Sequence, residues 1–235
     1  MHNSITVPAT SKRRVVDAFT RTLHACMAVS FGLAYITSEM EGLRLVHVTM
    51  GYTLGAVCLI RVMWGVVGPR RVKLKGLAGR LGTLDHTLEM IKSFDWQGLV
   101  KLLLAVSMMT LLICSMPVVA SGYVTYLDWL GKWTKEVHET LGNLMLLAVL
   151  FHVVAVTLLN MDKNERQGRP MITGCVPGNG PDLVKHNLVA ASLALLLVLV
   201  SFWFWQAYQY ILDPQFTHQP QWLHPSGGYA ESDDD

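Results

Sequence analysis

The sequence has few charged residues, and this shortage excludes several classes of protein. Only 15% of the 235 residues are Asp, Glu, Lys or Arg, while 51% are hydrophobic. Together with a mean hydropathy of +0.35, this composition is too apolar for an ordinary soluble domain of this length. The net charge of +2 comes without a basic stripe interleaved with aromatic residues, so we do not expect nucleic acid as a partner. The composition indicates an integral membrane protein.

Cysteine is also scarce, and the motifs built on it are missing. The sequence has no CxxCH, the attachment motif of covalent c-type haem, and no CxxC pair of the kind found in structural zinc sites. The four cysteines, Cys26, Cys58, Cys114 and Cys175, are too widely spaced for a disulfide framework. We expect the first three, which lie in apolar runs, to pack as small hydrophobic residues.

Long apolar runs are what the sequence does contain. A membrane helix needs about 20 mostly apolar residues. Five segments qualify, at about 15–37, 45–67, 98–120, 137–159 and 188–212. We therefore expect an all-α membrane domain over 15–212, between an N-terminal tail, 1–14, and a flexible tail, 213–235. The first run follows basic residues but lacks a small-residue cleavage site, so we interpret it as an uncleaved span.

Lysine and arginine are unevenly distributed between the two sides of these spans. If the N-terminus is cytoplasmic, all but three of the 19 lysines and arginines fall on the cytoplasmic side, the exceptions being Arg44, Lys132 and Lys135. The positive-inside rule thus predicts a bacterial inner-membrane protein with a cytoplasmic N-terminus and an extracytoplasmic C-terminus. Residues 69–94 then form a basic cytoplasmic loop, either a solvated topogenic loop or a docking surface. Residues 119–136 form an aromatic outer loop, which an interfacial belt explains.

Four of the nine histidines fall within the expected spans, where an unpaired polar side chain is costly. With this topology His24 and His152 lie toward the inner surface, and His47 and His138 toward the outer surface. His138 and His152 are fourteen residues apart, which is about 21 Å of rise and close to four turns, so both project from one face. Two neutral imidazoles at one depth suit the axial positions of a b-type haem. The alternative, in which each histidine bonds to a neighbouring helix, accounts less well for two level pairs.

Glycines accompany two of these histidines at helical spacing. The pattern HxTxG occurs at His47 and at His138, and it places Gly51 and Gly142 one turn beyond the histidine. A porphyrin that lies against a helix needs such a missing side chain beside its ligand. The same pattern also permits close packing of two helices.

Three arginines are candidate partners for the anionic propionates of haem, because a guanidinium pairs well with a carboxylate at a partly dry site. Arg61 follows His47 by fourteen residues and so shares its face at the inner level. Arg21 lies one turn before His24, and Arg44 lies near the outer end of the second span. For Arg21 and Arg44 the alternative is snorkelling to the lipid headgroups.

Three stretches carry a resemblance to a known family: "RTLH" at 21–24, "HVTMGYTLGAVCLIRVMWGVVG" at 47–68 and "HETLGNLMLLAVLFH" at 138–152. On these, and on a weaker "RPMITG" after the fourth span, the chain over about 15–174 resembles the bacterial cytochrome b561 family, to which the b-type cytochrome subunits of nickel-iron hydrogenases are also similar. The resemblance implies a four-helix core with two b-type haems, one held by His24 and His152 and the other by His47 and His138. Ala25 stands where the family often has Trp, and the fifth span goes beyond the minimal members.

The resemblance also implies transmembrane electron transfer, with the chain as the membrane subunit of an oxidoreductase. Electrons would pass between an extracytoplasmic partner, such as a cytochrome c or a hydrogenase-like subunit, and quinone, with lipid around the helices. A stand-alone superoxide or quinol oxidoreductase is one alternative. A metal or proton transporter that uses the histidines is the alternative from another class. The split into two levels, with no carboxylate to complete a metal shell, disfavours the transporter.

Overall fold

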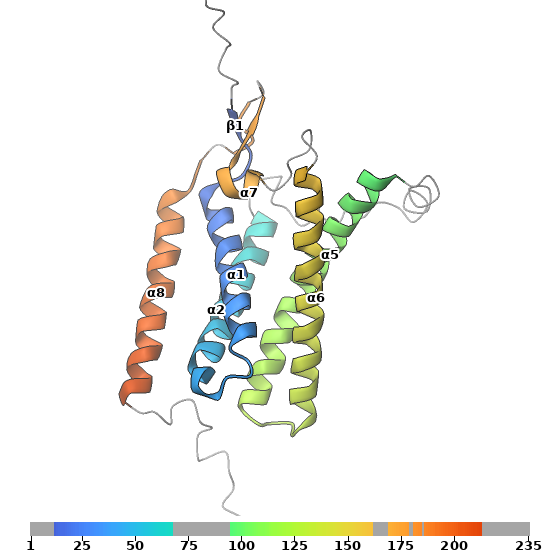
Figure 1. The fold of residues 1–235 in the computed structure, drawn as a ribbon. Helices are drawn as coiled ribbons and strands as arrows, with labels where there is room; N and C mark the ends of the chain where they lie inside the picture. Colours follow the sequence, from blue (N-terminus) through green and yellow to red (C-terminus); the bar gives the residue numbers. More distant parts are fainter. Residues whose placement is uncertain (1–11, 68–94, 162–168, 179–180, 185, 213–235) are drawn as a thin grey trace, which may run out of the picture.

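The computed structural model describes residues 12–67, 95–161, 169–178, 181–184 and 186–212. Its main elements are five long helices (Figure 1): α1 Ala18–Ile36, α2 Arg44–Val67, α5 Trp96–Tyr126, α6 Trp133–Met161 and α8 Val189–Leu212. Within the described ranges, α2, α5, α6 and α8 are long and apolar enough to cross a membrane. The expected all-α membrane fold is confirmed. The basic loop, 69–94, and the C-terminal tail, 213–235, lie outside the described residues.

The helix α1 is less apolar than the other four. Its 19 residues include Arg21, His24 and two threonines, which lower its hydropathy, and it is not among the four candidate spans. It packs along α2 and also contacts α8, so part of its surface is covered by its neighbours (Figure 1). Its crossing of the membrane stays a prediction, and its polar residues are those expected of a helix that faces its neighbours rather than lipid.

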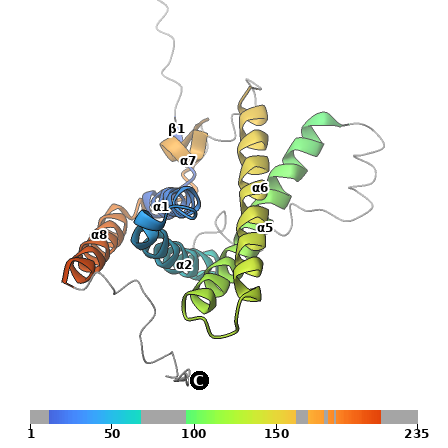
Figure 2. The same ribbon diagram turned by 60° about the horizontal axis from the view of Figure 1, so that its bottom comes forward.

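The helices form a four-helix core with a fifth helix outside it. The helix α1 packs along α2, α5 packs along α6, and contact between α2 and α5 joins the two pairs. At that contact a Cβ on Gly55 would lie 2.8 Å from Cγ1 of Val119, so the two backbones approach closely. The helix α8 packs against α1 and α2, on the side opposite to the pair of α5 and α6 (Figure 2). Nε1 of Trp203 on α8 donates to Oγ1 of Thr53 on α2 at 2.9 Å.

The prediction of an outer loop at 119–136 is wrong at its start. The helix α5 runs for 31 residues to Tyr126, so Tyr123 and Tyr126 lie on the helix and the connection to α6 is short. Asp128 and Gly131 turn this connection with φ angles of 51° and 79°. The aromatic residues concealed the helix end, because an interfacial belt can lie on the last turns of a helix as well as in a loop.

A small antiparallel ladder, which the sequence analysis did not anticipate, links the N-terminal segment to the segment before α8. Strand β1, Lys12–Arg14, pairs with β2, Cys175–Pro177, directly after the short helix α7, Arg169–Thr173. We call β1, α7 and β2 the latch (Figure 1). The backbone N–H groups of Val15 and Val16 both donate to the carbonyl oxygen of Gly174, at 2.8 and 3.1 Å.

The latch leads directly into the start of α1. Asp17, whose side chain is fully buried, is the N-cap of this helix and accepts a hydrogen bond from the backbone N–H of Thr20 at 2.6 Å. Such a cap satisfies one of the unpaired donors at a helix N-terminus. The expected N-terminal tail is therefore structured from residue 12 onward, and it determines where α1 begins.

Candidate functional site

The four histidines on the long helices lie in two pairs. His24 on α1 faces His152 on α6, with ring centroids 6.3 Å apart, and His47 on α2 faces His138 on α6, with centroids 6.1 Å apart. These are the pairings expected from the sequence. Two imidazoles on opposite sides of one metal ion have centroids about 6 Å apart, given metal–nitrogen bonds of about 2 Å. Both pairs therefore have the spacing that a bis-histidine site requires.

Backbone carbonyl groups orient the rings of His47 and His138. We call these two the outer pair, and His24 and His152 the inner pair, after the orientation predicted from the sequence. Nδ1 of His47 lies 2.7 Å from the carbonyl oxygen of Ala34, and Nδ1 of His138 lies 3.0 Å from that of Val118. A carbonyl oxygen only accepts, so each Nδ1 carries the proton and donates it, which leaves a lone pair on Nε2. Histidines that bind metals use this arrangement, because it holds the ring and makes the ligand nitrogen more basic.

Gly122 on α5 provides the space that the His138 ring occupies. A Cβ at this position would lie 2.8 Å from Cε1 of His138. Val118, whose carbonyl holds the same ring, and Ser121, whose Oγ lies 3.2 Å from Nδ1, are close by on the same helix. The sequence analysis missed Gly122. The available signal was a run of small residues, 120–122, within an apolar helix, which is typical of close helix contacts in membranes.

The outer pair lines a cavity of about 900 Å³ between α1, α2, α5 and α6. This volume is within the range of about 300–1,000 Å³ for ligand and cofactor sites. Gly51 and Gly142 also line it, and a Cβ added to either would meet nothing within 4 Å. Both glycines thus border open space beside the histidines, which suits a flat cofactor better than close packing of helices.

The inner pair is less enclosed by the described residues. His24 is exposed and His152 is half-buried. Nδ1 of His152 is buried and has no hydrogen-bond partner within the described ranges. A buried polar atom without a partner is costly, and within the described ranges the ring of His152 lacks the carbonyl partner that holds each ring of the outer pair.

Arg44 and Arg61 lie at different levels, as expected. Arg44, the first residue of α2, lines the outer cavity, and its Cζ lies 6.0 Å from the centre of the Tyr126 ring. Arg61 is close enough to His24 and to Asp17 for electrostatic interaction, which places it at the inner level. Each guanidinium is thus near one histidine pair, and the pairing with propionates stays a prediction.

Arg21 is engaged with the latch. Its Nη1 donates to the carbonyl oxygen of Ile172 in α7 at 2.8 Å, and a Cβ on Gly174 would lie 3.4 Å from its Cζ. Its Nε is buried without a partner within the described residues. Arg21 therefore joins α1 to the latch, and its pairing with a propionate stays a prediction.

Two further observations bear on other kinds of site. The four cysteines are free thiols, as expected from their spacing. The described part of the chain holds no group of three or more His, Cys, Asp or Glu side chains that could bind a metal ion.

Comparison with known proteins identifies the family. The sequence profile of the prokaryotic cytochrome b561 family matches residues 15–174, which is more than half of the chain and includes all four histidines. No curated protein and no solved structure matches the chain. The match confirms the resemblance seen in the sequence and implies binding of b-type haem and transmembrane electron transfer. The chain therefore belongs to the prokaryotic cytochrome b561 family.

Proposed function

We propose that the chain carries electrons across the membrane by means of two b-type haems, each held by one histidine pair. His24 and His152 hold the inner haem, and His47 and His138 hold the outer one. The observation that carries the proposal is the spacing of the ring centroids, 6.3 Å in the inner pair and 6.1 Å in the outer pair. When bound, haem supplies a one-electron couple between Fe(III) and Fe(II).

The chain's own residues hold this site and adjust its properties. The carbonyl groups of Ala34 and Val118 keep the Nδ1 protons of the outer pair in place, so that Nε2 is the nitrogen presented for ligation. Arg44 and Arg61 supply positive charge at the two levels, which favours binding of propionates. The surrounding apolar helices exclude water and so influence the reduction potential.

We further propose that the chain is the membrane subunit of an oxidoreductase. It would pass electrons between an extracytoplasmic redox protein, such as a cytochrome c or a hydrogenase-like subunit, and quinone. The resemblance to hydrogenase cytochrome subunits supports this role. So does the presence of α8, a fifth helix that lies outside the four-helix core.

The spectrum of the purified protein tests the haem proposal. We expect a reduced-minus-oxidised difference spectrum of b-type haem, and two haems per chain by the pyridine haemochrome assay. A colourless preparation would rule the proposal out.

Reduction of the haems by a quinol analogue, without any protein partner, tests the role of quinone. Reduction of quinone by superoxide with this chain alone would favour the stand-alone alternative over the subunit.

Single alanine variants test the pairing. We expect His47→Ala and His138→Ala each to remove the same haem, and His24→Ala and His152→Ala each to remove the other. The measurement is the haem stoichiometry together with the α-band maximum of the haem that remains. His186→Ala, outside the long helices, is the matched control and should retain both haems. Loss of the same haem from His138→Ala and His24→Ala would contradict the proposed pairing.

A further inference from the structure

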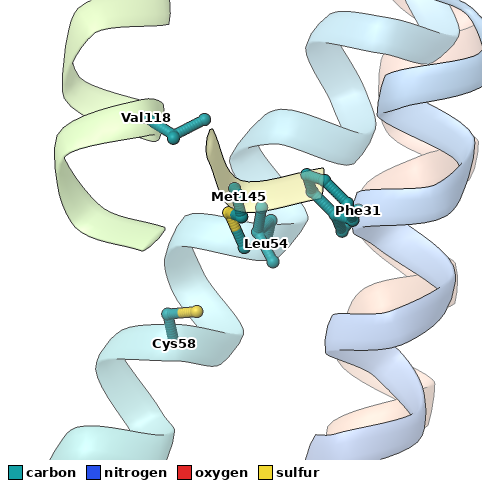
Figure 3. Packing of buried hydrophobic residues seen from close by; sticks show 5 residues of the cluster. All are labelled: Phe31, Leu54, Cys58, Val118 and Met145. Atoms are coloured by element: carbon teal, nitrogen blue, oxygen red, sulfur yellow. The ribbon is translucent and has the colours of Figure 1, made fainter. Parts of the chain in front are cut away.

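A packed apolar layer lies midway between the two histidine pairs. Three of its residues, Phe31, Leu54 and Met145, each follow a histidine of their own helix by seven residues, or about two turns. With Cys58 and Val118 they form one buried cluster, which we call the middle layer. Figure 3 shows side chains from α1, α2, α5 and α6 that converge in it. The layer is entirely apolar apart from the thiol of Cys58.

Phe31 forms part of the floor of the outer cavity. It lines that cavity together with Leu54 and Val118, and only 8% of its surface is exposed. Its ring centroid lies 5.9 Å from that of Tyr35, which lines the same cavity. One side of the Phe31 ring therefore borders the space beside the outer histidine pair.

The other side of the middle layer continues toward the inner pair. Met27, one turn before Phe31 on α1 and three residues after His24, packs against the middle layer. The Cys58 thiol donates to Sδ of Met27 at 3.7 Å. Side chains spaced by three or four residues lie along one face of a helix. A continuous line of side chains on α1 thus runs from His24 through Met27 and Phe31 to the outer cavity.

We propose that Phe31 is the packing contact that joins the two histidine levels. It closes the floor of the outer cavity against water, and it fills the space through which an electron passes between the two levels. In that step one electron leaves the reduced site and enters the oxidised site, no bond forms or breaks, and no proton moves. The electron-transfer half of this inference depends on the function proposed above, whereas the water-barrier half does not.

The thiol of Cys58 is a native reporter for the water barrier. It lies in the middle layer and is 2% exposed, and a thiol reacts with an alkylating reagent only where reagent and water can reach it. We expect Phe31→Ala to increase the rate at which a small maleimide labels Cys58, measured by mass spectrometry of the peptide. Phe31→Leu, which keeps most of the volume, should leave Cys58 protected. Val29→Ala, on the exposed side of α1, is the matched control.

The electron-transfer half is tested by the rate at which the two sites exchange electrons after flash reduction of one of them. We expect the rate to be native in Phe31→Tyr and Val29→Ala, lower in Phe31→Leu and several-fold lower in Phe31→Ala. The haem content and both midpoint potentials should stay unchanged, which separates a packing effect from a change in driving force.

The outcomes separate this inference from the proposed function. If Cys58 stays unreactive in Phe31→Ala, the water barrier is wrong. If both Phe31→Leu and Phe31→Ala exchange electrons at the native rate with both haems bound, the packing contact is wrong. If Phe31→Ala fails to fold, the Phe31→Leu rate still decides the second question. Absence of haem from the native chain would overturn the proposed function and leave the labelling result valid.

Discussion

At the scale of single residues, the end of α1 determines how one histidine is held. The last four carbonyl groups of a helix have no partner within it, and Ala34 lies in the last turn of α1, which ends at Ile36. Its carbonyl oxygen accepts from Nδ1 of His47 on the next helix. This carbonyl oxygen at the helix end, which also accepts from Oγ1 of Thr37 at 3.4 Å, thus fixes the proton on Nδ1 of His47 and leaves the lone pair on Nε2.

Gly51 provides the sharpest residue-level prediction, because it borders open space. A Cβ here would meet no atom of another element within 4 Å, so Gly51→Val should leave the fold of the apoprotein intact. If a porphyrin occupies this space, the same change should greatly reduce the content of the outer haem. The measurement is haem stoichiometry beside the thermal midpoint of the apoprotein. Gly32→Val, also at an open position but not lining the cavity, is the control; equal haem content in both variants would contradict the site.

The sequence predicted the pairing of the histidines but not their surroundings. His138 and His152 stand fourteen residues apart on one helix, and helical geometry alone places them on one face at two depths. Gly122 and the carbonyl of Val118 were not predictable in this way, because their role depends on how α5 is rotated against α6. Packing of side chains sets that rotation, and no periodic pattern in the sequence reports it.

At the scale of elements, the latch contains a glycine that the backbone requires. Gly174 has a φ of 77°, and a Cβ there would lie 2.9 Å from the carbonyl oxygen of Val16. A left-handed conformation alone costs a residue with a side chain about 1–2 kcal/mol. Gly174→Ala should therefore lower the free energy of unfolding by more than this amount. Gly131 has a similar φ of 79°, but a Cβ there would meet no atom within 4 Å. Gly131→Ala should therefore show only the cost of the backbone conformation. The measurement is urea unfolding in detergent. Equal losses of unfolding free energy in the two variants would refute a specific contact at Gly174.

The attachment of α8 rests in part on one polar contact. Trp203→Phe removes the donor that reaches Thr53 on α2, and hydrogen bonds between membrane helices contribute about 0.6 kcal/mol on average. We expect a loss of stability of this order and faster cleavage by protease in the segment before α8. Trp205→Phe makes the same chemical change on the exposed face of the helix. Identical behaviour of the two variants would show that this hydrogen bond does not hold α8.

The helices were predictable from the sequence to within a few residues at most of their ends, whereas the ladder was not. An apolar run of about 20 residues is a strong signal because the bilayer demands it. The strands β1 and β2 have three residues each, too few for a recognisable alternation. Their pairing also joins distant parts of the chain, which local pattern does not encode.

At the scale of the whole molecule, the expected topology remains to be measured. The latch and the first turns of α5 lie at the same end of the bundle (Figure 1), as alternating spans require if α1 crosses the membrane. We expect alkaline phosphatase fused after Asp235 to be active and the same enzyme fused within 162–168 to be inactive, because it folds only outside the cytoplasm. A fluorescent protein that matures only in the cytoplasm should give the opposite pattern at each site. If the phosphatase fused at the C-terminus is inactive and the fluorescent protein fused there is fluorescent, the orientation is the opposite of the one predicted.

The latch also gives the molecule an order of assembly. The backbone of Arg14 is held by the side chain of Asp182, 168 residues later in the chain, and β1 cannot pair until β2 has left the ribosome. The outer histidine pair is held by the end of α1 and by α2, α5 and α6, so it can be complete while the start of α1 is still unattached. The nascent protein therefore closes last at the end that carries the latch, and a chain that stops before Cys175 would lack this final attachment of the helix that carries His24.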